Sequence, residues 1–255
     1  MQKTTIEWVK NADGSPGYTW NPQTGCLRDC SYCYGRKIAT RFAGSVAFPV
    51  GFEPAFWPER LKEPQLIRKH SRIFVCSMGE LFGPWVVKKD IQKVVDVARS
   101  LPRHTFMFLT KFPYRLKEFN PWPANCWVGV SATDDEMAYD AYAWLREVDA
   151  PVRFMSFEPL LEGIEDNRLT LLAKVCDWFI VGERTQPTKC PHLFWVEAIR
   201  AVAIHYRVPL FIKDSLRKTV EELYADVPEW ITTQEFPKEE DQGNDNHCQV
   251  MASVA

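Results

Sequence analysis

The sequence is poor in glycine, has no long apolar run and carries no excess of charge of one sign. Only 12 of its 255 residues are glycine, which excludes collagen-like and glycine-rich proteins. No apolar run approaches the ~20 residues of a membrane-spanning helix, so we expect no membrane partner. The 31 Lys and Arg nearly balance the 33 Asp and Glu. The formal net charge of −2 excludes a histone-like polycation but is compatible with a local basic groove.

The first residues also lack the apolar stretch of a secretory signal peptide. We therefore expect a cytoplasmic protein, whose cysteines stay reduced. The composition, 46% hydrophobic and 25% charged, is that of an ordinary globular chain. We predict a single domain over residues 1–236. The KEEDQGNDN run and its neighbours contain few apolar residues, so a flexible tail is predicted over residues 237–255.

Short β-rich runs alternate with helical runs along the predicted domain. Most of the β-rich runs are continuously apolar, which is typical of parallel strands buried on both faces. Strands are predicted at 18–21, 72–77, 105–110, 126–131, 152–157, 178–181 and 210–213. This alternation indicates βαβ units in an α/β fold and favours a partial or complete (β/α) barrel of six to seven parallel strands. A doubly wound open sheet is the alternative.

Apolar residues at i, i+3 and i+4 spacing predict the intervening helices. Helices are expected at 87–101, 193–206 and 215–224, and another opens at the capping-box pattern Thr133–Glu136. Residues 42–69 are rich in proline and aromatics and show little periodicity. We expect them to form a long loop with a short helix that covers one end of the sheet.

Three of the eight cysteines are clustered in a loop predicted over residues 22–34. Cys26, Cys30 and Cys33 have the spacing C-x3-C-x2-C, which chance would give fewer than ~0.01 times in a chain of this composition. A structural zinc site needs a fourth ligand, and the sequence has no second CxxC. Three thiolates on one loop suit a 4Fe–4S cluster with one iron left open. The residues favour this cluster over zinc or redox-sensing thiols.

This loop, which follows the first strand of a βα-repeat chain, resembles the radical S-adenosylmethionine superfamily. The resemblance implies that Cys26, Cys30 and Cys33 ligate the cluster, that S-adenosylmethionine binds its open iron, and that Tyr32 lies beside the adenine. It also implies an external reductant of the flavodoxin or ferredoxin type. Reductive cleavage of S-adenosylmethionine then gives methionine and a 5′-deoxyadenosyl radical, which takes a hydrogen atom from the substrate.

Further segments resemble a narrower group, an uncharacterised phage-associated family of radical-SAM-like proteins with three cysteines. The resemblance covers most of residues 18–216 and brings no known substrate with it. The segments occur in the order WNPQTGC, SMGELF, FLTK, VGVSATD, RFMSFEPLL, WFIVGER and PLFIKDS.

Two of these segments suggest further contacts to S-adenosylmethionine. The Ser77–Glu80 turn resembles the GGE-type motif of the superfamily, so Gly79 and Glu80 are expected to hold the methionine ammonium. The alternative for Glu80 is a solvated turn. Ser131 and Thr133 follow the fourth predicted strand and would bind the ribose or the carboxylate. Thr133 has an alternative role as a helix cap.

Polar residues also follow the other predicted strands. These candidate catalytic residues are Lys111, Glu158, Arg184 and Lys213. The carboxyl ends of parallel barrel strands share one side, so we expect the four side chains to share a cavity with the cysteines. The three basic groups suit an anionic substrate, which favours a nucleic acid or nucleotide and a role in repair or modification. The alternative for Glu158 is a salt bridge to Arg153 or Lys213.

Two functions from different classes fit these residues. The first is a radical S-adenosylmethionine enzyme. The second is a non-catalytic Fe–S or zinc-binding module that recognises a nucleic acid or a partner protein. The polar strand ends and the Ser77–Glu80 turn favour the enzyme, because a binding module does not need them. The sequence leaves the oligomeric state open.

Overall fold

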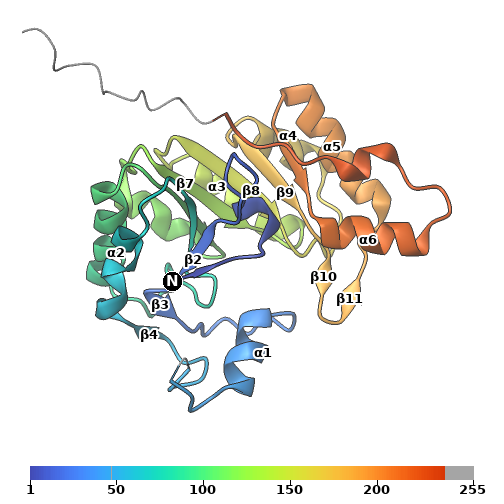
Figure 1. Cartoon of the computed structure of the whole chain (residues 1–255). Coiled ribbons are helices and arrows are strands. Elements are labelled where there is room, and N and C mark those ends of the chain that lie inside the picture. The colour runs from blue at the N-terminus through green and yellow to red at the C-terminus, as the bar shows by residue number, and fades with distance from the viewer. Residues whose placement is uncertain (47, 239–255) are drawn as a thin grey trace, which may run out of the picture.

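The computed structural model describes residues 1–46 and 48–238, which form a curved sheet with helices on its outer face (Figure 1). In this part of the chain the main sheet has eight strands in the order β1-β2-β5-β6-β7-β8-β9-β12. The edge strand β1 (Gln2–Lys3) is antiparallel to β2, and all later neighbours are parallel. The parallel strands are β2 (Tyr18–Trp20), β5 (Arg72–Val75), β6 (Thr105–Thr110), β7 (Cys126–Ser131), β8 (Val152–Phe157), β9 (Trp178–Val181) and β12 (Leu210–Ile212).

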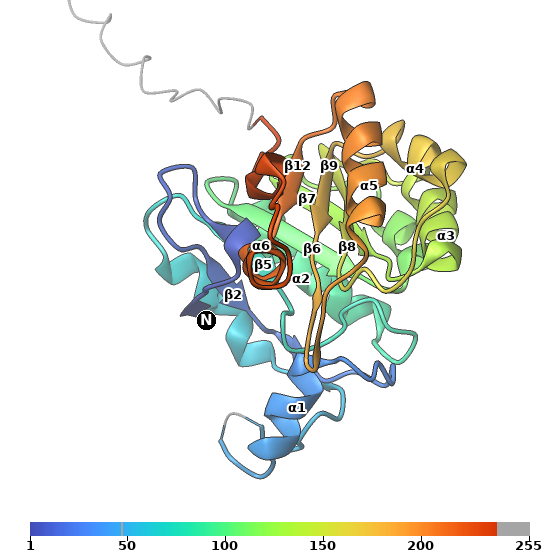
Figure 2. The ribbon, with the colours of Figure 1, turned by 90° about the vertical axis from the view of Figure 1, so that its right-hand side faces the viewer.

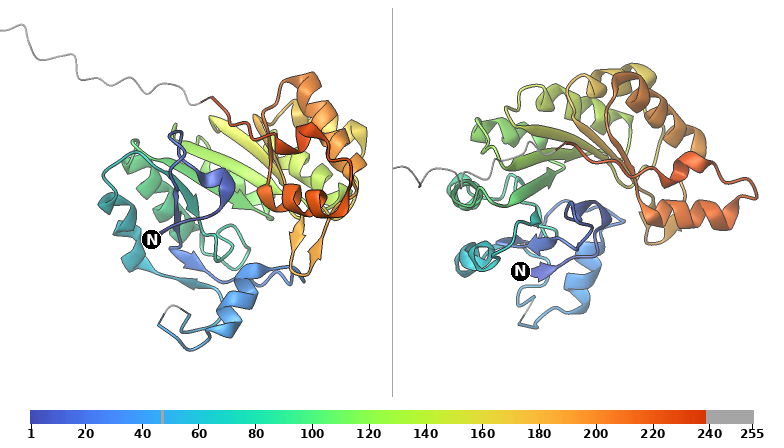
Figure 3. Two further views of the ribbon diagram at one scale, coloured as in Figure 1. Left: turned by 45° about the vertical axis from the view of Figure 1, so that its right-hand side comes forward. Right: turned by 45° about the horizontal axis from the view of Figure 1, so that its top comes forward.

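The sheet curves into an arc whose two edges are β1 and β12, so the barrel is partial (Figure 3). The predicted α/β fold with up to seven parallel strands is confirmed. Each predicted strand is present, and several end one or two residues earlier than expected. The continuously apolar runs are buried on both faces, which is why they could be recognised as parallel strands.

Helices follow most of the strands, and α3, α4 and α5 pack along the outer face of the arc (Figure 3). The helices are α1 (Tyr34–Arg41), α2 (Lys88–Ser100), α3 (Asp135–Leu145), α4 (Asp166–Ala173), α5 (Leu193–Tyr206) and α6 (Asp214–Leu223). Four short 3-10 helices are η1 (Glu7–Val9), η2 (Pro58–Leu66), η3 (Pro113–Phe119) and η4 (Glu229–Thr232). The described helices include none long and apolar enough to cross a membrane.

Aromatic side chains fill the concave inner face of the sheet. Trp8 of η1 packs edge-on against Phe74, with ring centroids 4.7 Å apart, and Trp127 packs against Trp178 at 5.7 Å. Phe154 of β8 joins this inner cluster, whereas the alternate residues of the same strand face the helices. The N-terminal segment therefore plugs part of the barrel interior.

One local prediction is wrong, and a second is incomplete. The helix α3 is capped by Asp134, whose Oδ1 accepts a hydrogen bond from the Met137 amide at 2.9 Å, and not by Thr133. The aspartate carboxylate takes the position expected for the threonine hydroxyl, so the helix starts one residue later. Residues 42–69 contain a 3-10 helix and the strand β4 (Ala55–Phe56), which pairs with β3 (Gln23–Thr24).

Other elements were not predicted. The helices α1 and α4 have eight residues each, too few for a clear period. The hairpin of β10 (Arg184–Thr185) and β11 (Thr188–Lys189) was also missed. The predicted tail lies outside the described residues except for Pro237 and Lys238.

The buried histidine just before β6 predicts acid sensitivity of the fold. Burial, together with the neighbouring Arg103, lowers the pKa of His104 from its usual 6.5 to about 4. The folded state therefore binds this proton less readily than the unfolded state, and stability is lost as the pH falls from about 6.5 to about 4. We expect His104→Gln to reduce this loss of unfolding free energy by about 2 kcal/mol. Urea unfolding at the two ends of this pH range measures the loss. The control is His205→Gln, on the exposed face of α5, which should leave the pH dependence unchanged.

Candidate functional site

A cavity of about 300 Å³ lies at the carboxyl ends of the parallel strands. All three clustered cysteines line it, and so do the predicted residues Lys111, Glu158, Arg184 and Lys213. Tyr32, Gly79, Glu80 and Ser131 also line it. Thr133 is buried outside the lining, where its hydroxyl contacts Asp134 and the Met137 sulfur. The structure thus gathers all but one of the predicted site residues around one space.

The cysteine loop is fixed by a close backbone contact with the turn after β5. Gly25 donates its amide hydrogen to Met78 O at 2.9 Å, and its own carbonyl accepts the Glu80 amide at 3.1 Å. A Cβ on Gly79 would lie 2.8 Å from Thr24 Cα, and one on Gly25 would lie 2.2 Å from Glu53 O. Gly25 also has a φ of +78°, which favours glycine. Only glycine fits at both positions.

Backbone amides donate hydrogen bonds to two of the thiols. The Arg28 amide lies 3.3 Å from Cys26 Sγ, and the Arg36 amide lies 3.3 Å from Cys33 Sγ. Cys33 is the N-cap of α1, so its sulfur lies at the positive end of the helix. The Arg36 guanidinium donates to Cys26 O at 3.0 Å and to Arg28 O at 3.1 Å, which holds the loop closed.

The donor set fits an iron–sulfur group. Thiolates are the ligands of such clusters, and hydrogen bonds to sulfur tune them. Burial raises the pKa of Cys26 to about 11, and the charges of Cys30 and Cys33 add to this, so a bound metal would have to displace the proton. Among residues 1–46 and 48–238, no three potential ligands lie close enough to hold a metal ion. Metal binding would therefore require the thiols to draw together.

Glu80 is buried at the cavity wall, which excludes the solvated-turn alternative. Its Oε1 accepts hydrogen bonds from Thr110 Oγ1 at 2.6 Å and from the Phe82 amide at 3.0 Å. Its Oε2 accepts one bond, from the Lys111 amide at 3.2 Å. Burial raises the pKa of Glu80, although these three donors oppose the shift. The carboxyl is thus rigidly held, with one oxygen less occupied than the other.

Lys111 connects the cysteine loop to the end of β7. Its ammonium donates a hydrogen bond to Ser131 Oγ, and that hydroxyl donates to Glu158 O at 3.1 Å. The ammonium also lies 5.8 Å from the centre of the Tyr32 ring. Burial lowers the pKa of Lys111, and the neighbouring Cys30 opposes this shift.

Lys213 and Glu158 form an ion pair across the end of β9. A Cβ on Gly182 would lie 2.9 Å from Lys213 Cδ and 3.1 Å from Glu158 Cγ, so the glycine makes room for the pair. Burial disfavours the charge of Lys213, but the Glu158 carboxylate outweighs it and raises the pKa of the lysine. The salt-bridge alternative for Glu158 is therefore correct for Lys213, and the pair still lines the cavity.

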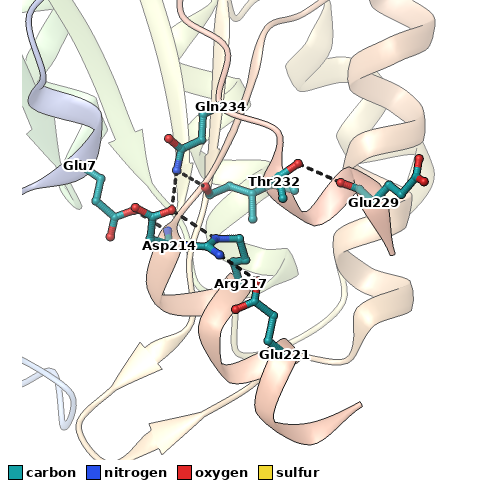
Figure 4. A network of polar contacts seen from close by, with 8 residues as sticks. Glu7, Asp214, Arg217, Glu221, Glu229, Thr232 and Gln234 are labelled. Atoms are coloured by element: carbon teal, nitrogen blue, oxygen red, sulfur yellow. Dashed lines mark hydrogen bonds and ion pairs between the residues drawn. The ribbon is translucent and has the colours of Figure 1, made fainter. Parts of the chain in front are cut away.

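A polar network fixes the start of α6 directly after Lys213 (Figure 4). The Asp214 amide donates to the Glu7 carboxylate, and Gln234 Nε2 donates to Asp214 Oδ1 at 3.0 Å. Arg217 pairs with Glu221 at 2.8 Å one turn further along. These contacts join the N-terminal segment to the end of β12 and so hold Lys213 in place.

Arg184 lines the cavity from the β10–β11 hairpin, which extends toward α1 (Figures 1 and 2). Its Nε donates to Pro187 O at 3.0 Å within the hairpin. Lys37 of α1 donates to Gln186 O at 3.1 Å, which connects the two elements.

The lining also includes residues outside the predicted set, among them Ser156 and Glu183. Ser156 lies inside an apolar strand and so gave no signal. Glu183 follows β9 next to Arg184, and its place after a strand is the signal for it.

Comparisons with known proteins place this chain in a family and in a fold. Residues 3–230 match the family DUF5131, described as a protein of unknown function, and the chain belongs to this family. No curated protein sequence matches it.

Two solved structures are similar, both of spore photoproduct lyase. One is a double mutant with bound AdoMet and dinucleoside spore photoproduct, at 11% identity and a TM-score of 0.50, covering 88% of this chain and 77% of that one. The other is a single mutant at 12% identity and a TM-score of 0.51, covering 81% and 64%. At such identity they show the fold alone, a partial (β/α) barrel. The phage association stays a prediction.

The glycine contact under the cysteine loop gives a testable prediction. Gly79→Ala should lower the free energy of unfolding by about 1–3 kcal/mol, because the new methyl group meets the backbone of Thr24. It should also displace the cysteine loop and reduce the iron bound per chain after anaerobic reconstitution. Gly163→Ala is the control, since its Cβ would meet Trp195 Nε1 at 2.8 Å, a similar clash at a residue outside the cavity lining. Equal iron content in both variants would contradict the prediction.

Proposed function

We propose that this protein is a radical S-adenosylmethionine enzyme that acts on a nucleic acid or a nucleotide. One observation carries the proposal: the three cysteines of the C-x3-C-x2-C loop line the same cavity as the polar residues at the ends of the barrel strands. A loop that served only a structural metal would have no reason to open into such a cavity.

Cys26, Cys30 and Cys33 would hold the 4Fe–4S cluster. When bound, the cluster and S-adenosylmethionine supply reductive cleavage of the cosubstrate and hydrogen abstraction, with the electron coming from a flavodoxin- or ferredoxin-type reductant. Glu80 would accept a hydrogen bond from the methionine ammonium through Oε2, which has only the Lys111 amide as a partner. Gly79 would keep this turn close to the cysteine loop.

Of the other predicted cofactor contacts, two line the cavity and one does not. Ser131 lines it and would bind the ribose or the carboxylate of the cosubstrate. Tyr32 lines it beside Lys111 and would contact the adenine. Thr133 does not line the cavity, so it would act through its hydrogen bond with Tyr32. This bond opposes the rise that burial causes in the pKa of that tyrosine.

Lys111, Glu158, Arg184 and Lys213 would bind and orient the substrate. Lys213 keeps its charge because Glu158 raises its pKa. Burial lowers the pKa of Lys111, so its ammonium loses a proton more readily. Lys111, Arg184 and Lys213 line one cavity. Three basic side chains there favour an anionic group in the substrate.

Two observations support a nucleic acid as that substrate. A solved structure of the same fold holds a dinucleoside. In addition, residues 26–42 carry four basic residues and one acidic residue, although the whole chain has a net charge of −2. The exposed rings of Tyr34 and Phe42 lie in this basic segment, and aromatic groups among cations are typical of single-strand binding.

Anaerobic reconstitution with iron and sulfide tests the proposal. The wild type should become brown and form 5′-deoxyadenosine from S-adenosylmethionine, and Cys26→Ala, Cys30→Ala or Cys33→Ala should abolish both. Cys190→Ala should change neither, because Cys190 is a partly buried cysteine outside the cavity. A colourless wild type that binds one zinc ion tightly would support the non-catalytic module instead.

Glu80→Gln should weaken S-adenosylmethionine binding in calorimetry while leaving the iron content unchanged. The loss of one charge-assisted hydrogen bond corresponds to about 1.5–3 kcal/mol, or roughly ten- to a hundred-fold in affinity. The control is Glu118→Gln, which removes a half-exposed carboxylate outside the cavity. Wild-type affinity in Glu80→Gln would restrict Glu80 to holding the turn.

A further inference from the structure

Two residues of the cavity lining bury a polar atom that finds no hydrogen-bond partner among residues 1–46 and 48–238. Glu183 is 5% exposed and its Oε2 is unpaired, and Ser156 is fully buried with an unpaired Oγ. Neither residue has a role in the function proposed above. Buried polar groups are normally paired, and a buried carboxylate without a partner is especially unfavourable. Both atoms therefore need a donor or an acceptor from outside the protein.

Glu183 follows Gly182, whose Cβ position lies against both partners of the ion pair described above. It follows β9, whose neighbours in the sheet are β8 and β12, the strands that precede Glu158 and Lys213. Thr219 of α6 donates a hydrogen bond to Glu183 Oε1 at 3.0 Å and fixes the carboxyl. The ammonium of Lys213 is directed to Glu158 instead. The half-buried Glu158 thus takes the ammonium, and the buried Glu183 is left without it.

The charges around Glu183 do not supply the missing partner. Burial raises the pKa of its carboxyl, and Glu222 adds to the shift, while Thr219 and Lys213 oppose it. Glu158, Glu7 and Glu183 all raise the pKa of Lys213, but the hydrogen bond of its ammonium goes to Glu158. Glu183 Oε2 therefore still lacks a hydrogen-bond donor.

A ligand that supplies the missing donor has an N–H group for Glu183. Next to it, the ligand has an oxygen atom that accepts a hydrogen bond from Lys213. A lactam group, with C=O adjacent to N–H, has this arrangement. Thymine, uracil and guanine carry it, whereas cytosine and adenine present an acceptor nitrogen beside an amino group. Ser156 can donate or accept, so it is compatible with a second base oxygen.

We propose that Glu183, together with Lys213 and Ser156, forms a subsite for the lactam edge of a nucleobase. This inference rests on the proposed function for the substrate class and adds the kind of base that is bound. Glu183 accepts the hydrogen bond from the ring N–H, and Lys213 donates to the neighbouring carbonyl.

Binding of short oligothymidylate and oligodeoxycytidylate at one salt concentration tests the subsite. The wild type should bind the thymine oligomer about ten-fold more tightly, the discrimination expected from one correctly paired base edge. Glu183→Gln and Glu183→Ala should both lose most of this preference, and the alanine variant removes the question of how the Gln amide rotates. Glu222→Gln removes the same charge from an exposed position outside the cavity and should keep the preference.

The inference is overturned if the wild type binds neither oligomer, if it binds both equally, or if the Glu183 variants keep the preference. The 5′-deoxyadenosine assay on the same samples separates the two proposals. A wild type that forms 5′-deoxyadenosine but shows no thymine preference overturns the subsite alone. A wild type that forms none overturns the enzyme, and a thymine preference lost in the Glu183 variants would still support the subsite.

Discussion

The contact between Gly25 and Gly79 is the constraint on which the site depends. The turn after β5 approaches the cysteine loop so closely that Gly79 has no room for a side chain, and Gly25 is excluded from carrying one by the backbone of Phe52 and Glu53. The Gly25 amide and carbonyl then pair with the turn after β5, so the cysteine loop continues the edge of the sheet. Because the other strands end on the same side, this contact helps to bring the thiols into the cavity formed by the strand ends.

Two half-buried lysines in this cavity behave differently because their partners differ. Lys111 donates to the neutral hydroxyl of Ser131, so burial prevails and its pKa falls. Lys213 faces the Glu158 carboxylate, and its pKa rises despite the burial. The charge of Lys213 is thus largely balanced within the protein. Lys111 lies nearer the cysteine loop and gains most from a negative charge in the cavity.

The sequence predicts much of the fold because its strands are continuously apolar and its longer helices are periodic. The bounds of α5 agree with the predicted helix. Short elements stayed hidden because long-range contacts determine them, as when β3 pairs with β4 some thirty residues later. The strand-end rule located Lys111 and Lys213. The same rule could not show that Glu183 Oε2 is left without a hydrogen bond, because this depends on where Thr219 and Lys213 direct their own hydrogen bonds.

The nearly neutral composition conceals a local basic segment that matters for function. The basic segment 26–42 forms the cysteine loop and α1, and Lys37 connects α1 to the β10–β11 hairpin. Glu158 and Glu183 line the cavity, together with Lys111, Arg184 and Lys213. A polyanionic chain would be held by its phosphates at these cations, while the buried Glu183 would contact a neutral base that enters the cavity. Phosphate contacts position a nucleic acid and base contacts specify it, and the two tasks fall here on different elements.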